Sequence, residues 1–307
     1  MLYNLYREFR AGMGWRELAW RCLAELPEFT VRSTTVHGKL SYSNKDWVIS
    51  KALFLGGEFE YEKIQKAVAL AVEAGCISPK NQGYIIDVGA NIGTVCITLV
   101  REGVFSAALA FEPEPRNYRL LVKNIRRNHL ARSIEAFNYA LSSAPGKLDM
   151  ELSIHNFGDH RLRIQGAALE YGQMREVERS RITVGVHRLD DVLTALQIRP
   201  EEIRLLWMDV QGHEKHVVEG ADLLLRCGVP VVAEFWPYGL ARAGVSPSQF
   251  HACAIARFGH FYDLGEQVPR RRPIAELPEM FGRYRDATQF SDLLLLARQE
   301  QGQTART

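Results

Sequence analysis

The sequence predicts an α/β fold with a doubly wound, mostly parallel sheet, preceded by an N-terminal extension of helices and a short hairpin. Three observations carry this prediction. Short apolar runs alternate with helical segments from Tyr84 onward. The first run leads into a glycine-rich turn, Asp87–Gly93, and the second ends at an acidic residue, Glu112. Strands that alternate with helices form βαβ units, whose sheet is parallel and covered on both faces.

The N-terminal extension covers residues 1–80 and has its own periodic segments. Apolar spacing and alternation predict helix at residues 1–26, a strand or hairpin at 30–43 and helix at 62–74. Gly12 and Gly14 divide the first helix, Pro27 ends it, and Gly75 ends the last one. We expect this extension to form a lid or a dimerisation element.

The main domain is predicted to span residues 81–298. Apolar runs predict strands at residues 84–88, 107–111, 134–138, 203–208, 229–235 and 289–296. Helical spacing predicts helices at residues 94–101, 116–128 and 213–226. An insertion at 142–200 shows no clear helix–strand rhythm until Leu189, which is typical of a functional or disordered connection. The polar residues 299–307 are predicted to form a disordered tail.

The bulk composition fits a soluble globular protein and gives no sign of a membrane span. Of 307 residues, 47% are apolar and 24% are charged, and the formal net charge of +2 gives no indication of a nucleic-acid partner. No apolar run approaches the roughly 18 residues that a membrane span needs. Five scattered cysteines without a CxxC pair favour a reducing compartment, so we expect a cytoplasmic protein.

The turn Asp87-Val88-Gly89-Ala90-Asn91-Ile92-Gly93 has the composition of a ligand-binding loop between a strand and a helix. Gly89 permits a tight turn, and Gly93 permits close approach of the helix and a ligand. Dinucleotide sites use G-x-G-x-x-G, and the glycine spacing here differs. The carboxylate of Asp87 suits a positively charged amino group better than a phosphate. The turn therefore favours S-adenosylmethionine, bound by Asp87, Gly89, Ala90, Asn91 and Gly93, with Glu112 accepting hydrogen bonds from the ribose hydroxyls.

At this point the sequence resembles the FkbM-type methyltransferases of the class I superfamily. The resemblance runs from about Ile85 to about Leu296. It rests on the segments Ile86–Gly93, Phe111–Pro113, Asn138–Ser142, Gly158–Leu162, Leu189–Asp190, Met208–Glu214 and Phe290–Leu294. It implies a seven-stranded, Rossmann-like sheet whose last strand is antiparallel, and methyl transfer to a hydroxyl of a natural product or sugar. It also places Pro113, Asn138 and Ala140 beside the cofactor.

Asp209, at the end of the fourth predicted strand, is the expected general base or acceptor-positioning group, and it also borders the cofactor. His213 and Glu214 are the next catalytic candidates, although a solvated helix face for His213 and a helix-dipole role for Glu214 remain open. The family has Lys and Glu where this chain has Trp207 and Gln211. Asp209, His213 and Glu214 could gather a divalent metal, but the sequence does not favour a metal site.

Two further segments are expected to meet the methyl acceptor, which we expect to be a small molecule or a glycan. These candidates are Asp159, His160, Arg161, Trp236 and Tyr238. Trp236 and Tyr238 could form a flat wall for a ring, and core packing of Trp236 is equally compatible with the sequence.

Two other functions remain open at this stage. A nicotinamide-dependent oxidoreductase would also use a doubly wound sheet, and a scaffold that binds S-adenosylmethionine without turnover would explain the missing Lys and Glu. The oligomeric state is open as well, a homo-oligomer included.

Overall fold

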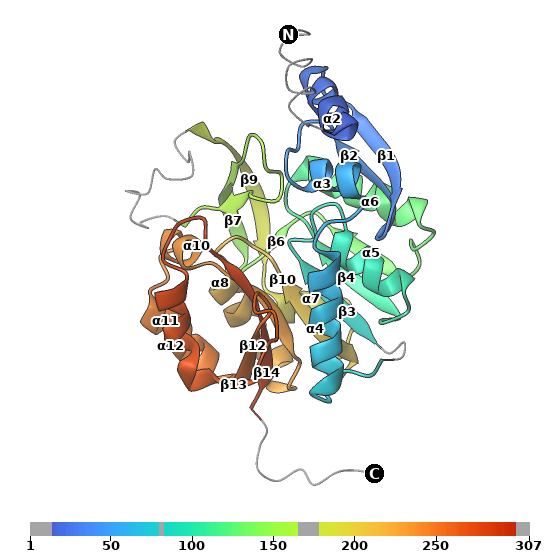
Figure 1. Cartoon of the computed structure of the whole chain (residues 1–307). Helices are drawn as coiled ribbons and strands as arrows, with labels where there is room; N and C mark the ends of the chain where they lie inside the picture. The colour runs from blue at the N-terminus through green and yellow to red at the C-terminus, as the bar shows by residue number, and fades with distance from the viewer. Residues whose placement is uncertain (1–13, 80–82, 165–177, 299–307) are drawn as a thin grey trace.

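The computed structural model describes residues 14–79, 83–164 and 178–298 of the chain. Within these residues the central sheet has eight strands, in the order β13-β12-β14-β11-β10-β3-β4-β5 (Figure 1). The strands from β11 to β5 are parallel, whereas β14, β12 and β13 are antiparallel to their neighbours. Their bounds are β3 Tyr84–Val88, β4 Ala107–Phe111, β5 Ile134–Phe137, β10 Ile203–Met208, β11 Val231–Phe235, β12 Phe258–Asp263, β13 Arg272–Pro273 and β14 Ser291–Ala297.

The α/β prediction and the antiparallel last strand are confirmed, but the count of seven strands is wrong for the described chain. The eighth strand, β13, is a two-residue pairing of Arg272 and Pro273 with the edge of β12. The sequence reading also omitted β12, in which Gly259 and His260 interrupt the apolar residues. Phe258 and Phe261 of this strand are nevertheless fully buried.

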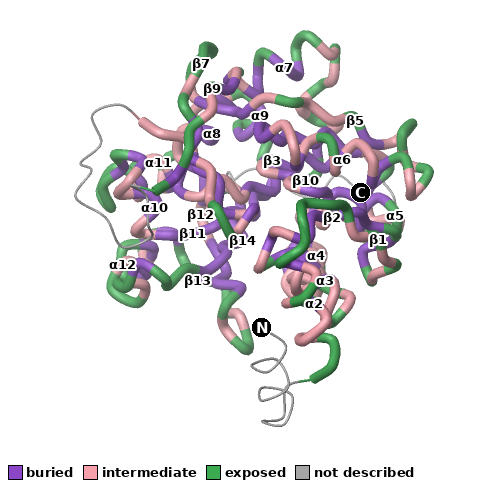
Figure 2. The backbone as a smooth tube through the Cα atoms, turned by 90° about the horizontal axis from the view of Figure 1, so that it is seen from above, coloured by how far each residue is buried: buried purple, intermediate pink, exposed green. Residues whose placement is uncertain are grey.

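Two apolar layers lie on either side of the sheet, because successive side chains of a strand point to opposite faces. Ile85 of β3 packs in one layer, whereas Ile86 and Val88 pack in the other. The Ile85 layer includes α2 (Trp15–Glu25), α3 (Ile49–Gly56), α4 (Tyr61–Glu73), α5 (Thr94–Arg101) and α6 (Pro115–Arg127). The other includes α7 (Leu189–Ala195), α8 (Glu214–Gly220), α9 (Asp222–Arg226), α10 (Pro237–Arg242), α11 (Pro247–Ile255) and α12 (Leu277–Arg283). Figure 2 shows buried residues along the strands between these helices.

The N-terminal segment contributes to the same core as the main sheet. The predicted hairpin is confirmed as β1 (Thr30–Thr35) and β2 (Gly38–Ser43), and the predicted helix 62–74 is confirmed as α4. The second half of the first predicted helix is α2, while residues 1–13 lie outside the described chain. Helix α3 was not predicted. Trp20 and Ile64 pack with Ile85 of the first sheet strand in one apolar cluster.

The insertion 142–200 contains strands before Leu189, where the sequence showed no clear helix–strand rhythm. Its described residues contribute to a second sheet of four strands, ordered β6-β9-β7-β8. The strands are β6 Ala140–Leu141, β7 Gly146–Leu152, β8 Arg161–Leu162 and β9 Ser180–His187. The polar–apolar alternation of residues 147–152 was a readable signal for β7.

The predicted helix 213–226 is two short helices, α8 and α9, separated at Ala221. Gly220 explains how α8 can pack so closely on the insertion, because a Cβ there would lie 2.1 Å from the Ser142 carbonyl oxygen. The predicted tail, residues 299–307, lies outside the described chain. Among the described helices, none combines the length and apolarity that a membrane crossing requires.

Candidate active site

Two neighbouring cavities lie at the carboxyl ends of the parallel strands, where open α/β sheets bind ligands. The inner cavity holds about 500 Å³ of empty space. Its walls are Val88, Gly89, Asn91, Phe111, Glu112, Pro113, Asn117, Ala140, Leu141, Met150, Phe157, Gly158, His160, Leu162, Asp209 and Val210. The outer chamber holds about 710 Å³. Its walls are Val48, Ile49, Phe59, Glu60, Asn156, Gly158, Asp159, Arg161, Asp209, Gln211, Glu234, Trp236, Ala287, Thr288 and Phe290. Gly158 and Asp209 belong to both.

The glycine turn after β3 is as tight as its sequence predicts. Gly89 has φ +83°, and a Cβ on it would lie 2.0 Å from the Asp209 carbonyl oxygen. Asn91 also adopts a left-handed conformation, with φ +50°. Gly93 has φ +95° and approaches Ile97 and Leu121, and α5 begins at Thr94, as the helical spacing predicts. The missing Cβ atoms therefore let the turn lie directly against the end of β10.

Asp87 and Ala90 hold the turn by hydrogen bonds to the neighbouring elements α5 and β4. The Asp87 carboxylate accepts a hydrogen bond of 3.0 Å from the Cys96 amide in the first turn of α5. Burial raises the pKa of Asp87 to about 6, and the hydrogen bonds from Cys96 oppose this shift. The Ala90 amide donates to the Phe111 carbonyl. Neither Asp87 nor Ala90 belongs to the walls of the inner cavity given above.

Glu112 does face the inner cavity, at the end of β4. Its two carboxylate oxygens accept hydrogen bonds from the amides of Asn91, at 2.9 Å, and Glu114, at 2.8 Å. Burial raises the pKa of Glu112 to about 8, against the effect of these two amides. Asn138 does not belong to the walls given above, since its side-chain amide donates to the carbonyls of Glu112 and Pro113. Glu112 is thereby held rigidly with its carboxylate at the cavity.

A loop of the insertion covers the inner cavity, and sequence reasoning missed most of it. The Phe157 carbonyl accepts hydrogen bonds of 2.9 Å from the side-chain amides of Asn91 and Asn117. The Phe157 amide donates to the buried carboxylate of Asp46, and the Trp47 amide donates to the His155 carbonyl. The cover is therefore attached both to the glycine turn and to the N-terminal segment.

Asp209 lies between the two cavities and is held by Gln211. The Gln211 side-chain amide donates to Asp209, at 2.6 Å, and to Glu234, at 3.0 Å. Gln211 has φ +55°, a left-handed conformation that directs the turn after β10. Burial raises the pKa of Asp209 to about 7 and raises the pKa of Glu234 well above its usual value. Gln211, which stands where the family has Glu, thus places a neutral hydrogen-bond donor between the carboxyl groups of Asp209 and Glu234.

Lys63, a lysine of the N-terminal extension, interacts electrostatically with Asp209. Lys63 of α4 lies 2.6 Å from the Glu60 carboxylate and 2.9 Å from the Asp292 carboxylate. Burial lowers the pKa of Lys63, but Asp292, Glu60 and Asp209 raise it more, so the net shift is upward. The Lys63 charge in turn lowers the pKa of Asp209. No sequence pattern marked Lys63 or Glu60, because only the fold brings α4 to the end of β10.

His213 and Glu214 are both buried, and neither is a wall residue of either cavity as given above. The solvated helix face considered for His213 is wrong, because its side chain is 2% exposed and its Nε2 lies 2.9 Å from the Ser142 hydroxyl. One oxygen of Glu214 accepts hydrogen bonds from the amides of Val210 and Gly212, each at 3.2 Å. Burial raises the pKa of Glu214 to about 8. These contacts close the turn that presents Asp209.

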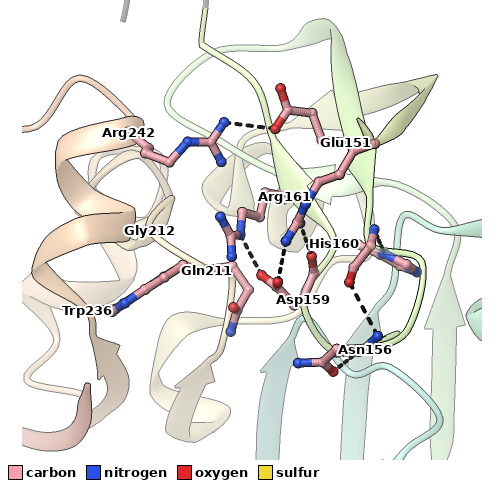
Figure 3. A network of polar contacts seen from close by, with 12 residues as sticks. Glu151, Asn156, Asp159, His160, Arg161, Gln211, Gly212, Trp236 and Arg242 are labelled. Atoms are coloured by element: carbon pink, nitrogen blue, oxygen red, sulfur yellow. Dashed lines mark hydrogen bonds and ion pairs between the residues drawn. The ribbon is translucent and has the colours of Figure 1, made fainter. Parts of the chain in front are cut away.

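The charged loop Asp159–Arg161 forms a buried ion-pair network at the outer chamber (Figure 3). Asp159 accepts hydrogen bonds from the guanidinium groups of Arg161 and Arg179, both at 2.5 Å. The Arg161 guanidinium lies 4.4 Å from the centre of the Trp236 ring. The ring nitrogen of Trp236 donates to the Ala287 carbonyl, and Tyr238 lies beside the ring, with centroids 5.3 Å apart. Arg161 therefore covers part of the wall that Trp236 was expected to offer.

His160 lies on the opposite side of this loop from its neighbours. It borders the inner cavity, whereas Asp159 and Arg161 border the outer chamber. In the described ranges, no three His, Cys, Asp or Glu side chains are arranged as ligands of one metal ion.

Replacing Gln211 by Glu is expected to destabilise the protein by about 2 kcal/mol at pH 8, and by less at pH 5. The change removes a donor shared by Asp209 and Glu234 and adds a third carboxyl group at the same place. Urea unfolding at the two pH values measures the difference. Gln197→Glu is the matched control, because Gln197 is exposed and has a similar φ of +58°. Equal losses in both variants would contradict the charge argument.

Comparisons with known proteins find methyltransferases. The sequence profile of the methyltransferase FkbM domain matches residues 87–244, half of the chain. Methyltransferase sdnD of Sordaria araneosa is 31% identical over 156 residues, which are 45% of this chain and 60% of that protein. Methyltransferase 1 of Beauveria bassiana is 25% identical over 153 residues, 46% of this chain and 59% of its own length. The match thus spans about three fifths of each of these relatives.

Solved structures with a similar fold include methyltransferase FkbM from Methylobacillus flagellatus. It is 14% identical with a TM-score of 0.45, over 90% of this chain and 58% of that one. A putative transferase from Pyrococcus horikoshii is 12% identical with a TM-score of 0.42, over 87% of this chain and 71% of that one. The profile match covers the glycine turn, Glu112 and Asp209 together, and on that match the chain belongs to the FkbM methyltransferase family.

Proposed function

We propose that this chain is an S-adenosylmethionine-dependent methyltransferase that methylates a hydroxyl group of a natural product or sugar. The observation that carries the proposal is that Asp209 lies in the wall shared by the inner cavity and the outer chamber. A methyl donor in one cavity and an acceptor in the other would meet at this residue.

The inner cavity fits the nucleoside cofactor. The Glu112 carboxylate can accept hydrogen bonds from both ribose hydroxyls. Gly89 leaves room at the end of β3, and the side chains of Phe111, Leu141 and Met150 offer apolar contact for a purine ring.

The outer chamber has the character of a site for a neutral acceptor. Its inner end carries acidic groups, Asp209 and Glu234, and Arg161 there is paired with Asp159. Phe290 and Val48 are apolar wall residues that are 49% and 41% exposed. This arrangement favours a molecule with an apolar body and hydrogen-bond donors, and it disfavours an anion. Val48, Ile49, Phe59 and Glu60 come from the N-terminal extension, which supports its role as a lid.

Bound S-adenosylmethionine supplies an electrophilic methyl group. Asp209 would accept the hydroxyl proton of the acceptor as the acceptor oxygen takes up the methyl group. The Gln211 amide orients the Asp209 carboxylate, and the Phe157 cover keeps water away from the inner cavity. Glu214 holds the turn between Asp209 and α8 without touching either ligand.

The direct test measures transfer of labelled methyl groups from S-adenosylmethionine to a panel of hydroxylated acceptors, with S-adenosylhomocysteine titrated separately to measure cofactor binding. We expect micromolar binding of S-adenosylhomocysteine and label in an ether linkage. Binding of NAD without binding of S-adenosylhomocysteine would instead support an oxidoreductase. Label on nitrogen would refute the hydroxyl assignment alone.

Glu112→Gln is expected to weaken S-adenosylhomocysteine binding about 30-fold, measured by calorimetry. Gln has one acceptor oxygen in place of two, so it cannot serve both amides and the ribose hydroxyls. Glu135→Gln, on the exposed side of the neighbouring strand β5, is the control and should leave the affinity unchanged. An unchanged affinity in Glu112→Gln would rule out ribose binding by this residue.

A further inference from the structure

The inner cavity contains two buried polar atoms that have no partner. They are Nε2 of His160 and Oδ1 of Asn117, and both residues belong to the cavity wall. His160 is 7% exposed and Asn117 is 1% exposed. Buried polar atoms are normally satisfied, so an unsatisfied pair in one cavity wall points to a ligand that supplies both missing partners.

The hydrogen-bonding roles of the two atoms follow from their other contacts. The Ser153 amide donates to Nδ1 of His160 at 3.0 Å, so Nδ1 carries no proton and Nε2 is an N–H donor. Burial lowers the pKa of His160 to about 4, which keeps the ring neutral although Glu114 raises its pKa and Arg116 and Arg179 lower it further. The Asn117 Nδ2 atom donates to the Phe157 carbonyl at 2.9 Å, so Oδ1 is an acceptor.

The donor and the acceptor both belong to residues that contact Phe157, and Asn117 stands at the start of α6. Asn117 bonds the Phe157 backbone, and the His160 ring lies 5.7 Å from the Phe157 ring. Asn117 stands five residues after Glu112, on the first turn of α6. Hydrogen bonds connect it to Glu112, the expected ribose contact, because Glu112 accepts from the Glu114 amide and Glu114 accepts from the Asn117 amide.

We propose that His160 and Asn117 bind the edge of the cofactor's adenine ring. Adenine presents an amino group, which is a donor, beside ring nitrogens that are acceptors. Oδ1 of Asn117 accepts from the adenine amino group, and Nε2 of His160 donates to a neighbouring ring nitrogen. This assignment rests on the proposed function for its cofactor, and it moves His160 from the acceptor site to the cofactor site.

The test compares three ligands by calorimetry: S-adenosylhomocysteine, S-inosylhomocysteine, which carries an oxygen in place of the adenine amino group, and 5′-methylthioadenosine, which lacks the amino-acid tail. The wild type should bind S-adenosylhomocysteine at least tenfold more tightly than S-inosylhomocysteine, because the new oxygen faces the Asn117 oxygen. Equal affinities would overturn the proposal without any variant.

Two variants locate the contact. Asn117→Leu should weaken S-adenosylhomocysteine about tenfold and remove most of the preference over S-inosylhomocysteine, while the Phe157 carbonyl keeps its bond from Asn91. His160→Asn keeps an acceptor for the Ser153 amide, removes the free donor, and should also weaken binding about tenfold. Both variants should weaken 5′-methylthioadenosine by the same factors. His187→Asn, an exposed change on β9, is the control and should alter none of the affinities.

Three outcomes overturn the assignment. If the variants weaken S-adenosylhomocysteine but not 5′-methylthioadenosine, the pair contacts the amino-acid tail. If folded variants bind all three ligands as the wild type does, the two atoms face no ligand. If the wild type binds no S-adenosylhomocysteine, the proposed function fails as well. The first two outcomes, by contrast, reject only the adenine assignment.

Discussion

Asp209→Asn is expected to lower the rate of methyl transfer by about 10²- to 10⁴-fold, the usual contribution of a general base. The substitution keeps an oxygen that can accept the hydrogen bond from Gln211, and it leaves the size of the side chain almost unchanged. It removes only the capacity to take the acceptor proton. S-adenosylhomocysteine affinity should therefore stay within about threefold of the wild type, because the substitution removes at most one weak contact to the cofactor.

The pH dependence separates this role from simple positioning. Burial raises the pKa of Asp209 to about 7, opposed by the Lys63 charge, so the wild-type rate should rise as the pH passes through 7. The Asp209→Asn variant should lack this rise. A raised pKa in the folded state also means that Asp209 stabilises the fold most at pH values below its ordinary pKa of 3.8 and that this stabilisation is lost as the pH rises to about 7. The variant should accordingly be at least as stable as the wild type at pH 8. A variant with wild-type rate at pH 8 would exclude Asp209 as the base.

The main sheet could be predicted because its elements carry local signals. The run 107–111 is uninterrupted and apolar and ends before an acid, and the run 84–88 is apolar except for Asp87 and follows a glycine; buried parallel strands have that composition. Strand β12 was missed because Gly259 and His260 break its pattern, although burial of Phe258 and Phe261 by α11 and α12 holds it in place. Tertiary packing decides such strands, and packing is not visible in a short window of sequence.

The cofactor side of the site was likewise easier to predict than the acceptor side. Gly89 and Glu112 stand at fixed positions relative to their strands, so the sheet places both of them at the inner cavity. The outer chamber collects side chains from α3, the segment before α4, the insertion and the segment before β14, which are far apart in the chain. Lys63 is the clearest case, because its effect on Asp209 arises only when α4 packs across the sheet. Long-range placement of this kind leaves no spacing rule in the sequence.

Gly89→Ala is expected to abolish measurable S-adenosylhomocysteine binding and to destabilise the protein by several kcal/mol. Two costs combine at this residue. A left-handed backbone, with φ +83°, costs an alanine about 1–2 kcal/mol. The new Cβ would also lie 2.0 Å from the Asp209 carbonyl oxygen, so the turn after β3 and the turn after β10 must separate. That movement shifts Asn91 and Glu112 together, since the Asn91 amide is hydrogen-bonded to Glu112.

Gly103→Ala separates these two costs. Gly103 has φ +73° and no atom within 4 Å of an added Cβ, so it carries the backbone cost alone. Thermal unfolding should show a small loss for Gly103→Ala, with cofactor affinity unchanged, and a much larger loss for Gly89→Ala. If both variants lose the same stability and Gly89→Ala still binds S-adenosylhomocysteine, contact between the two turns cannot be what shapes the inner cavity. Comparing the losses of stability and of S-adenosylhomocysteine affinity in the two variants therefore tests whether the wall at Asp209 requires a residue without a Cβ at position 89.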